Sequence, residues 1–72
     1  MKGNNGMENL LQRITFDQQV LRGKPVIRGL RISVEMILGL LAKGSTRQEI
    51  LEDYPVLEPE DIQAALAYAS EV

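Results

Sequence analysis

The chain has 72 residues and contains neither cysteine nor histidine, which limits both how it can be stabilised and what chemistry it can perform. No disulfide can hold the fold, and no thiolate or imidazole is present to bind zinc or to act as a nucleophile or its base. A chain of this length buries only about 60% of the surface that it would expose when unfolded, so one small apolar core must stabilise it. We therefore expect a single domain without metal or cofactor, and neither an enzyme nor a small-molecule substrate.

The second half of the chain carries apolar residues at the spacing of an α-helix. Four of them fall at positions i, i+3, i+4 and i+7, which predicts a helix over residues 34–43: Val34, Ile37, Leu38 and Leu41. Ser33 is a suitable N-cap for this helix, and Gly44 can adopt the left-handed conformation that ends it.

Two further helices are predicted over residues 46–53 and 59–71. Two capping boxes could start the first of them: Ser45 with Gln48, or Thr46 with Glu49. Pro59 suits the first position of the last helix, whose apolar stripe is Ile62, Ala65, Leu66 and Ala69. We interpret the acidic residues near its start as solvated carboxylates at a helix end rather than as a catalytic pair: Glu58, Glu60 and Asp61.

The N-terminal part of the chain is less regular. Residues 1–9 are rich in glycine and asparagine and are expected to form a flexible tail, which leaves residues 10–72 as the domain. Residues 14–33 are expected to form a β arm with a type II′ turn at Gly29–Leu30, although a single strand with a glycine bulge is an alternative. The predicted fold is mostly α with this short β arm, and its last two helices have the proportions of a helix-turn-helix.

Charge is distributed unevenly between the two halves of the chain. Residues 1–32 hold six basic and two acidic side chains, a formal charge of +4, whereas residues 33–72 hold two basic and eight acidic ones, a formal charge of −6. These halves either pair with each other across the fold or present a cationic face to a partner. The candidate residues of such a DNA- or partner-binding face are Arg22, Lys24, Arg28, Arg31 and Arg47.

Arg28 and Arg31 would face each other across the predicted turn, and like charges in that position destabilise a hairpin. An anion is therefore expected beside them, and its source stays open: the phosphate backbone of DNA, an acidic patch on a protein partner, or a carboxylate of the same chain such as Asp17, Glu35 or Asp53. The helix over residues 59–71 carries three acidic and no basic side chains, which is unfavourable for entering the major groove. Arg47 and the β arm are thus better candidates for DNA contact.

Some small and apolar residues lie outside the predicted core stripes. They form either ordinary helix surface or the interface of a homodimer or higher homo-oligomer, and we expect the interface. The candidate interface residues are Met36, Leu40, Ala64, Ala67 and Tyr68.

Several short motifs occur in a familiar order and spacing: Gly23–Ile32, Lys43–Ser45, Glu49–Ile50, Tyr54–Leu57 and Glu60–Ala69. Through them the chain resembles, over about residues 14–69, the bacterial family catalogued as domain-of-unknown-function family 433. The resemblance implies a trihelical, homeodomain-like or winged-helix-like fold with an N-terminal β arm. The chain departs from the family pattern at two positions: at Leu30, where a threonine is usual, and at Glu58, where a Ser/Thr cap is usual.

The same resemblance implies a function, because members of this family often look like antitoxins paired with nuclease-like toxins of the PIN type. We expect an antitoxin-like binding protein that neutralises such a toxin, with operator DNA as a second candidate partner. The alternative is a dimeric protein–protein interaction module with no nucleic-acid contact. No apolar stretch is long enough to span a bilayer and the N-terminus does not resemble a secretion signal, so we expect a cytoplasmic protein without membrane contact.

Overall fold

Helices make up most of the described chain, and a short antiparallel pair of strands lies near its N-terminus. The computed structural model describes residues 6–71, apart from the side chain of Met7. The elements in chain order are α1 (Gly6–Leu11), β1 (Ile14–Thr15), the 3₁₀ turn η1 (Leu21–Gly23), β2 (Val26–Ile27), α2 (Val34–Ala42), α3 (Arg47–Asp53) and α4 (Pro59–Glu71). The three helices expected from the apolar pattern therefore agree with α2, α3 and α4 to within one residue at each end.

The first helix, α1, was not expected from the sequence. It overlaps the end of the flexible tail expected over residues 1–9, and residues 1–5 lie outside the described residues. Six residues are too few for a helix that is stable by its own propensity. Tertiary packing stabilises this one, because α1 lies against α4 and Leu10 packs against the buried core.

The β arm is folded differently from the predicted hairpin. β1 pairs with β2, with Ile14 opposite Ile27, and the expected second extended piece is reduced to an isolated bridge between Val26 and Ser33. The turn is centred on Arg28–Gly29 rather than Gly29–Leu30: both central residues have positive φ, 46° and 73°, and the Leu30 N–H donates to the Ile27 carbonyl at 2.7 Å. Two positive φ angles are typical of a type I′ turn, so the predicted type II′ turn is wrong.

The ends of the later helices follow the sequence signals. The Ser33 hydroxyl accepts a hydrogen bond from the Met36 N–H at the start of α2. Of the two capping boxes that the sequence allowed, the structure uses Thr46 with Glu49. Gly44 follows α2 with a φ of 102°, a conformation that favours glycine. Local rules of capping are sufficient to explain these boundaries.

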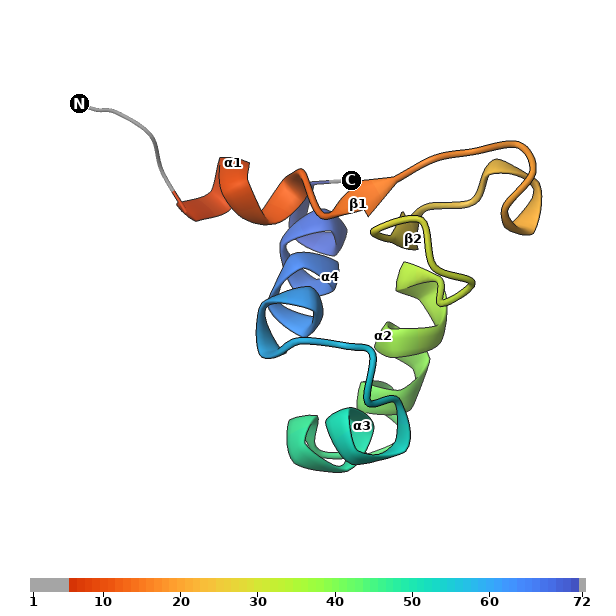
Figure 1. Ribbon diagram of the computed structural model, residues 1–72. Helices are drawn as coiled ribbons and strands as arrows, with labels where there is room; N and C mark the ends of the chain where they lie inside the picture. Colours follow the sequence, from red (N-terminus) through yellow and green to blue (C-terminus); the bar gives the residue numbers. More distant parts are fainter. Residues whose placement is uncertain (1–5, 72) are drawn as a thin grey trace.

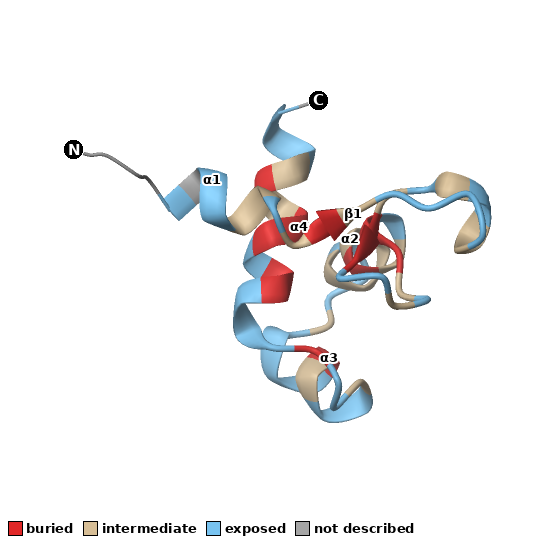
Figure 2. Cartoon of the chain, turned by 45° about the horizontal axis from the view of Figure 1, so that its top comes forward, coloured by how far each residue is buried: buried red, intermediate tan, exposed pale blue. Residues whose placement is uncertain are grey.

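The core lies where α2, α4 and the strand pair meet. α2 and α4 lie side by side, α3 contacts both of them, and α4 also contacts α1 and β1 (Figure 1). Buried residues occur on the inward faces of all three later helices and on both strands, whereas the connection that contains η1 projects away from the helices (Figure 2). The largest fully buried apolar side chains are Val26, Ile27, Ile37, Ile50 and Ile62. Among the described residues, no helix is both long and apolar enough to cross a membrane.

Candidate functional site

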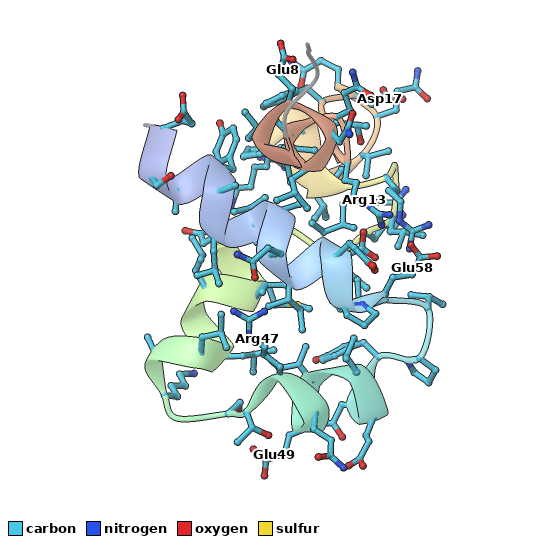
Figure 3. The ribbon with its side chains drawn as sticks, turned by 90° about the vertical axis from the view of Figure 1, so that its left-hand side faces the viewer. Glu8, Arg13, Asp17, Arg47, Glu49 and Glu58 are labelled. Carbon is cyan, nitrogen blue, oxygen red and sulfur yellow. The ribbon has the colours of Figure 1, made fainter. Side chains whose placement is uncertain are left out.

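A buried carboxylate, Asp61, joins the β arm to α4. Its side chain is 0% exposed and receives hydrogen bonds from two guanidinium groups. Arg28 binds it in a bidentate manner, with Nε 3.0 Å from Oδ1 and Nη2 2.8 Å from Oδ2, and Arg13 Nη1 lies 2.9 Å from Oδ1. The Glu58 N–H donates to Oδ2 at 2.8 Å, so the same carboxylate also caps α4. Arg13 additionally contacts the Glu58 carboxylate at 2.7 Å (Figure 3).

These contacts determine the charge state of Asp61. Burial by itself would raise the pKa of this carboxyl group, but the hydrogen bonds from Arg28, the Glu58 N–H and Arg13 outweigh burial and lower the pKa below its ordinary value. The pKa of Arg13 is raised by Glu58 and Asp61, and the pKa of Arg28 is raised by Asp61. Asp61, Arg13 and Arg28 are therefore all ionised at neutral pH. Among the described residues, no buried side-chain polar atom lacks a hydrogen-bond partner, which is typical of a structural ion-pair network.

The geometry corrects the prediction for Arg28. Its guanidinium group binds Asp61 and also donates to the Val56 carbonyl at 2.9 Å, so it is not a free cation for DNA or a partner. Its partner is an acid of the same chain, but not one of the three that were considered: Asp17, Glu35 and Asp53. The turn at Arg28–Gly29 is the reason, because it aims Arg28 toward α4 instead of across a hairpin at Arg31.

The other four predicted cations differ in what they contact. Arg47 Nη1 donates to Gln63 Oε1 at 2.8 Å, which ties α3 to α4 (Figure 3). Lys24 Nζ lies 3.3 Å from Glu35 Oε1, with both side chains largely exposed, so this pair is weak. Within residues 6–71, Arg22 and Arg31 are exposed and make no side-chain hydrogen bond or ion pair. The cationic face of the β arm therefore consists of three residues: Arg22, Lys24 and Arg31.

A second candidate surface is apolar and lies between α2 and α4. A pocket of about 340 Å³, which we call the Tyr68 pocket, is lined by Pro25, Val34, Glu35, Leu38, Tyr68 and Ala69. Phe16 extends this surface, because its ring centroid lies 6.2 Å from that of Tyr68 and its side chain is 59% exposed. From the sequence, Phe16 was expected only as part of the β arm over residues 14–33.

The predicted oligomer interface does not form one surface. Ala64 is 0% exposed and Ala67 is also buried, so neither can reach a second chain. The physical reason is that α4 is covered on more sides than expected, since α1 packs against it. Met36 and Leu40 are half-buried, and Leu40 packs against the core. Of the five residues predicted at the oligomer interface, Tyr68 lines the Tyr68 pocket.

The described residues offer no grouping of three or more acidic side chains that could hold a metal ion. The acidic residues at the start of α4 have divergent environments, because Asp61 is buried and Glu60 is exposed. Asp61 is thus not the solvated helix-end carboxylate that the sequence suggested. Its two arginine partners are 33 and 48 residues distant in sequence, and Arg13 was missed because nothing near it in the chain indicates the pairing.

Comparison with known proteins places the chain in a family. The chain is 36% identical over 56 residues to the uncharacterized protein y4eO of Sinorhizobium fredii (strain NBRC 101917 / NGR234), a match that covers 78% of this chain and 25% of that protein. The chain thus spans about a quarter of the length of that relative. No solved structure matches. The family model described as "Protein of unknown function (DUF433)" matches residues 14–69, nearly the whole described chain, and the protein therefore belongs to the DUF433 family.

Proposed function

We propose that this chain is an antitoxin-like protein that acts by binding a PIN-like nuclease toxin at the Tyr68 pocket. The observation that carries the proposal is Phe16, a large aromatic side chain that is 59% exposed beside this pocket. Exposed aromatic residues next to an apolar depression are typical of protein-binding surfaces, where such residues supply most of the binding energy. The family resemblance described above supplies the class of partner.

Charge complementarity supports a nuclease as the occupant. Glu35 is the one charged residue among those that line the pocket, and its side chain is 80% exposed. Residues 33–72 carry a formal charge of −6. An enzyme that acts on nucleic acid must attract a polyanion and so presents a cationic surface. We expect the bound segment to combine an apolar side chain, which enters the pocket, with a Lys or Arg opposite Glu35.

The proposal includes the finer description of the fold. We interpret α2, α3 and α4 as a trihelical, helix-turn-helix-like unit, because α3 contacts both of its neighbours and a short connection joins it to α4. The proposed role of this unit is to hold the pocket between α2 and α4. A nuclease toxin would act on cellular RNA, so the proposal requires that both proteins work in the cytoplasm.

The test is coexpression with the product of the neighbouring reading frame. We expect that product to be a PIN-like nuclease that arrests growth alone, and we expect the chain to bind it and restore growth. Phe16→Ser should weaken binding at least about 30-fold, as expected for an aromatic residue at the centre of an interface.

Val56→Ser is the matched control, because Val56 is equally exposed, at 57%, but does not line the pocket. Equal losses in the two variants would contradict the proposal, as would a neighbouring gene that encodes no nuclease. A third outcome concerns the alternative of a dimeric module: if the chain alone sediments as a dimer and Phe16→Ser makes it a monomer, the pocket is a self-association surface and not a toxin site.

A further inference from the structure

The β arm contains a long stretch with positive charge and no negative charge. Between Asp17 and Glu35 the chain has four basic residues and no acidic one. One of the four, Arg28, is neutralised by Asp61, and the other three form the cationic face defined above: Arg22, Lys24 and Arg31. Arg22 and Lys24 belong to the connection between β1 and β2, which projects away from the helices (Figure 2), whereas Arg31 follows β2. The charge of this face is therefore accessible to a large partner.

The turn that presents Arg22 has an unusual backbone. Leu21, Arg22 and Gly23 have φ angles of 49°, 58° and 80°, so three successive residues lie in the left-handed region. That region is unfavourable for residues other than glycine, and such conformations persist only where surrounding contacts impose them. Here the Gly23 N–H donates to the Asp17 carbonyl at 3.1 Å and the Lys24 N–H donates to the Leu21 carbonyl at 3.2 Å. The backbone of the turn is thus fixed while the Arg22 side chain stays in solvent.

A pocket brings two of these cations together. It has a volume of about 330 Å³, and its lining residues are Leu21, Arg22, Lys24 and Ser33. We call it the Arg22 pocket. Arg22 has no partner among the described residues, and Lys24 has only the exposed contact of 3.3 Å with Glu35. An exposed pair of this kind contributes little, so Lys24 can exchange Glu35 for an external anion at small cost.

We propose that the Arg22 pocket binds phosphate groups in the backbone of duplex DNA, with Arg31 as a flanking contact. Cations spread along a projecting segment suit a line of phosphates better than one enclosed phosphate ion. Recognition of single strands depends on aromatic side chains that stack on bases, and no residue that lines this pocket is aromatic. Contacts of this type position a protein on DNA without reading its sequence. The site goes beyond the proposed toxin-binding function and does not rest on it.

The test measures how binding depends on salt. A labelled duplex of about 20 base pairs and arbitrary sequence is titrated with the full chain by fluorescence anisotropy, between about 50 and about 200 mM salt. Each phosphate contact contributes about 0.9 to the slope of log K against log salt concentration. Arg22→Asn and Lys24→Ala should each reduce that slope by about one, and Arg22→Lys should leave it unchanged. Asparagine is chosen because it tolerates the left-handed backbone at this position.

Lys43→Ala is the matched control, since Lys43 is an exposed cation beyond the other end of α2 and its loss changes net charge equally. It should not change the slope. Circular dichroism melts establish that each variant is folded. Three results would each overturn the proposal. Lys43→Ala could reduce the slope as much as the pocket variants do, or the chain could fail to bind the duplex at the lowest salt concentration. In the third, the chain binds a poly-glutamate peptide as tightly as it binds the duplex. The last result would instead assign the pocket to an acidic protein.

Discussion

At the scale of single residues, the buried carboxylate of Asp61 is the point where several hydrogen bonds between distant parts of the chain meet. It receives hydrogen bonds from Arg13, which precedes β1, and from Arg28, which lies in the turn after β2. It also accepts from the Glu58 N–H at the start of α4. One fully buried carboxylate thus connects three segments that are far apart in the sequence, and it uses the arginine that would otherwise be the strongest candidate for an external anion.

We predict that Asp61→Asn lowers the free energy of unfolding by about 2 to 3 kcal/mol at neutral pH. Breaking a fully buried ion pair costs about 3 to 5 kcal/mol. The expected loss is smaller here because both arginine side chains reach solvent and can be hydrated once the carboxylate is gone. Urea denaturation measures the effect. Glu60→Gln, an exposed neighbour on the same helix, is the control and should change stability by less than about 0.5 kcal/mol.

The carboxylate of Asp61 should make the free energy of unfolding depend on pH in the acidic range. Its pKa in the folded state is lower than in the unfolded chain, so the stabilisation is present above about pH 4, the ordinary range of an aspartate, and is lost as pH falls through the folded-state pKa. The difference in stability between the wild type and Asp61→Asn should therefore shrink steadily below about pH 4. Denaturation curves at a series of pH values would reveal it. A difference that stays constant down to about pH 2 would contradict this account.

Sequence rules succeeded at this scale where the interaction is local. Ser33 caps α2 as predicted, and Thr46, one of the two candidates, caps α3, because each hydroxyl and the amide that it binds are three residues apart. Asp61 was misinterpreted because its partners come from other parts of the fold, and an aspartate at a helix start looks the same whether it is solvated or buried. The tertiary structure, not the local pattern, determines which of the two applies.

At the scale of elements, α1 changes the environment of α4. Ala64 and Ala67 were expected at an oligomer interface, but both are buried within one chain. α4 packs against α1 as well as against α2, α3 and β1. The three later helices were predictable because each has its own apolar residues and a local start signal, a capping hydroxyl for α2 and α3 and Pro59 for α4. α1 was not, since its six residues are helical through contact with α4 rather than through their own pattern.

This packing gives a prediction about size at two positions of α4. Ala64→Leu should destabilise the fold by about 1 to 3 kcal/mol, because a larger side chain is forced into a site that is 0% exposed. Ala69→Leu, on the exposed part of the same helix, should change stability by less than about 0.5 kcal/mol. Thermal unfolding of both variants separates the two cases. If Ala64→Leu were as stable as the wild type, Ala64 would lie on an open face of α4. The predicted oligomer interface at this position would then be supported again.

At the scale of the whole molecule, the charge asymmetry of the sequence is only partly cancelled by folding. Arg13 and Arg28 pair with acids of α4 and its start, as the interpretation of internal pairing expected. On the β arm, Arg22 and Arg31 stay exposed without a partner among the described residues, and Phe16 lies exposed beside Tyr68. The two proposed sites thus adjoin each other through the Lys24–Glu35 contact, since each of these residues lines a different pocket. The amino-acid sequence did not predict the two pockets or their proximity, because each pocket forms where segments from separate parts of the chain meet.

The most direct test of the central claim is to map the surface that the partner covers. Backbone amide NMR shifts of the chain, followed as the neighbouring nuclease is added, report each residue separately. We predict that the largest changes occur at Phe16, Leu38 and Tyr68 and that the amides around Val56 stay unchanged. Changes confined to Val56 and α3, with Phe16 and Tyr68 unaffected, would contradict the claim that the pocket between α2 and α4 is the binding site.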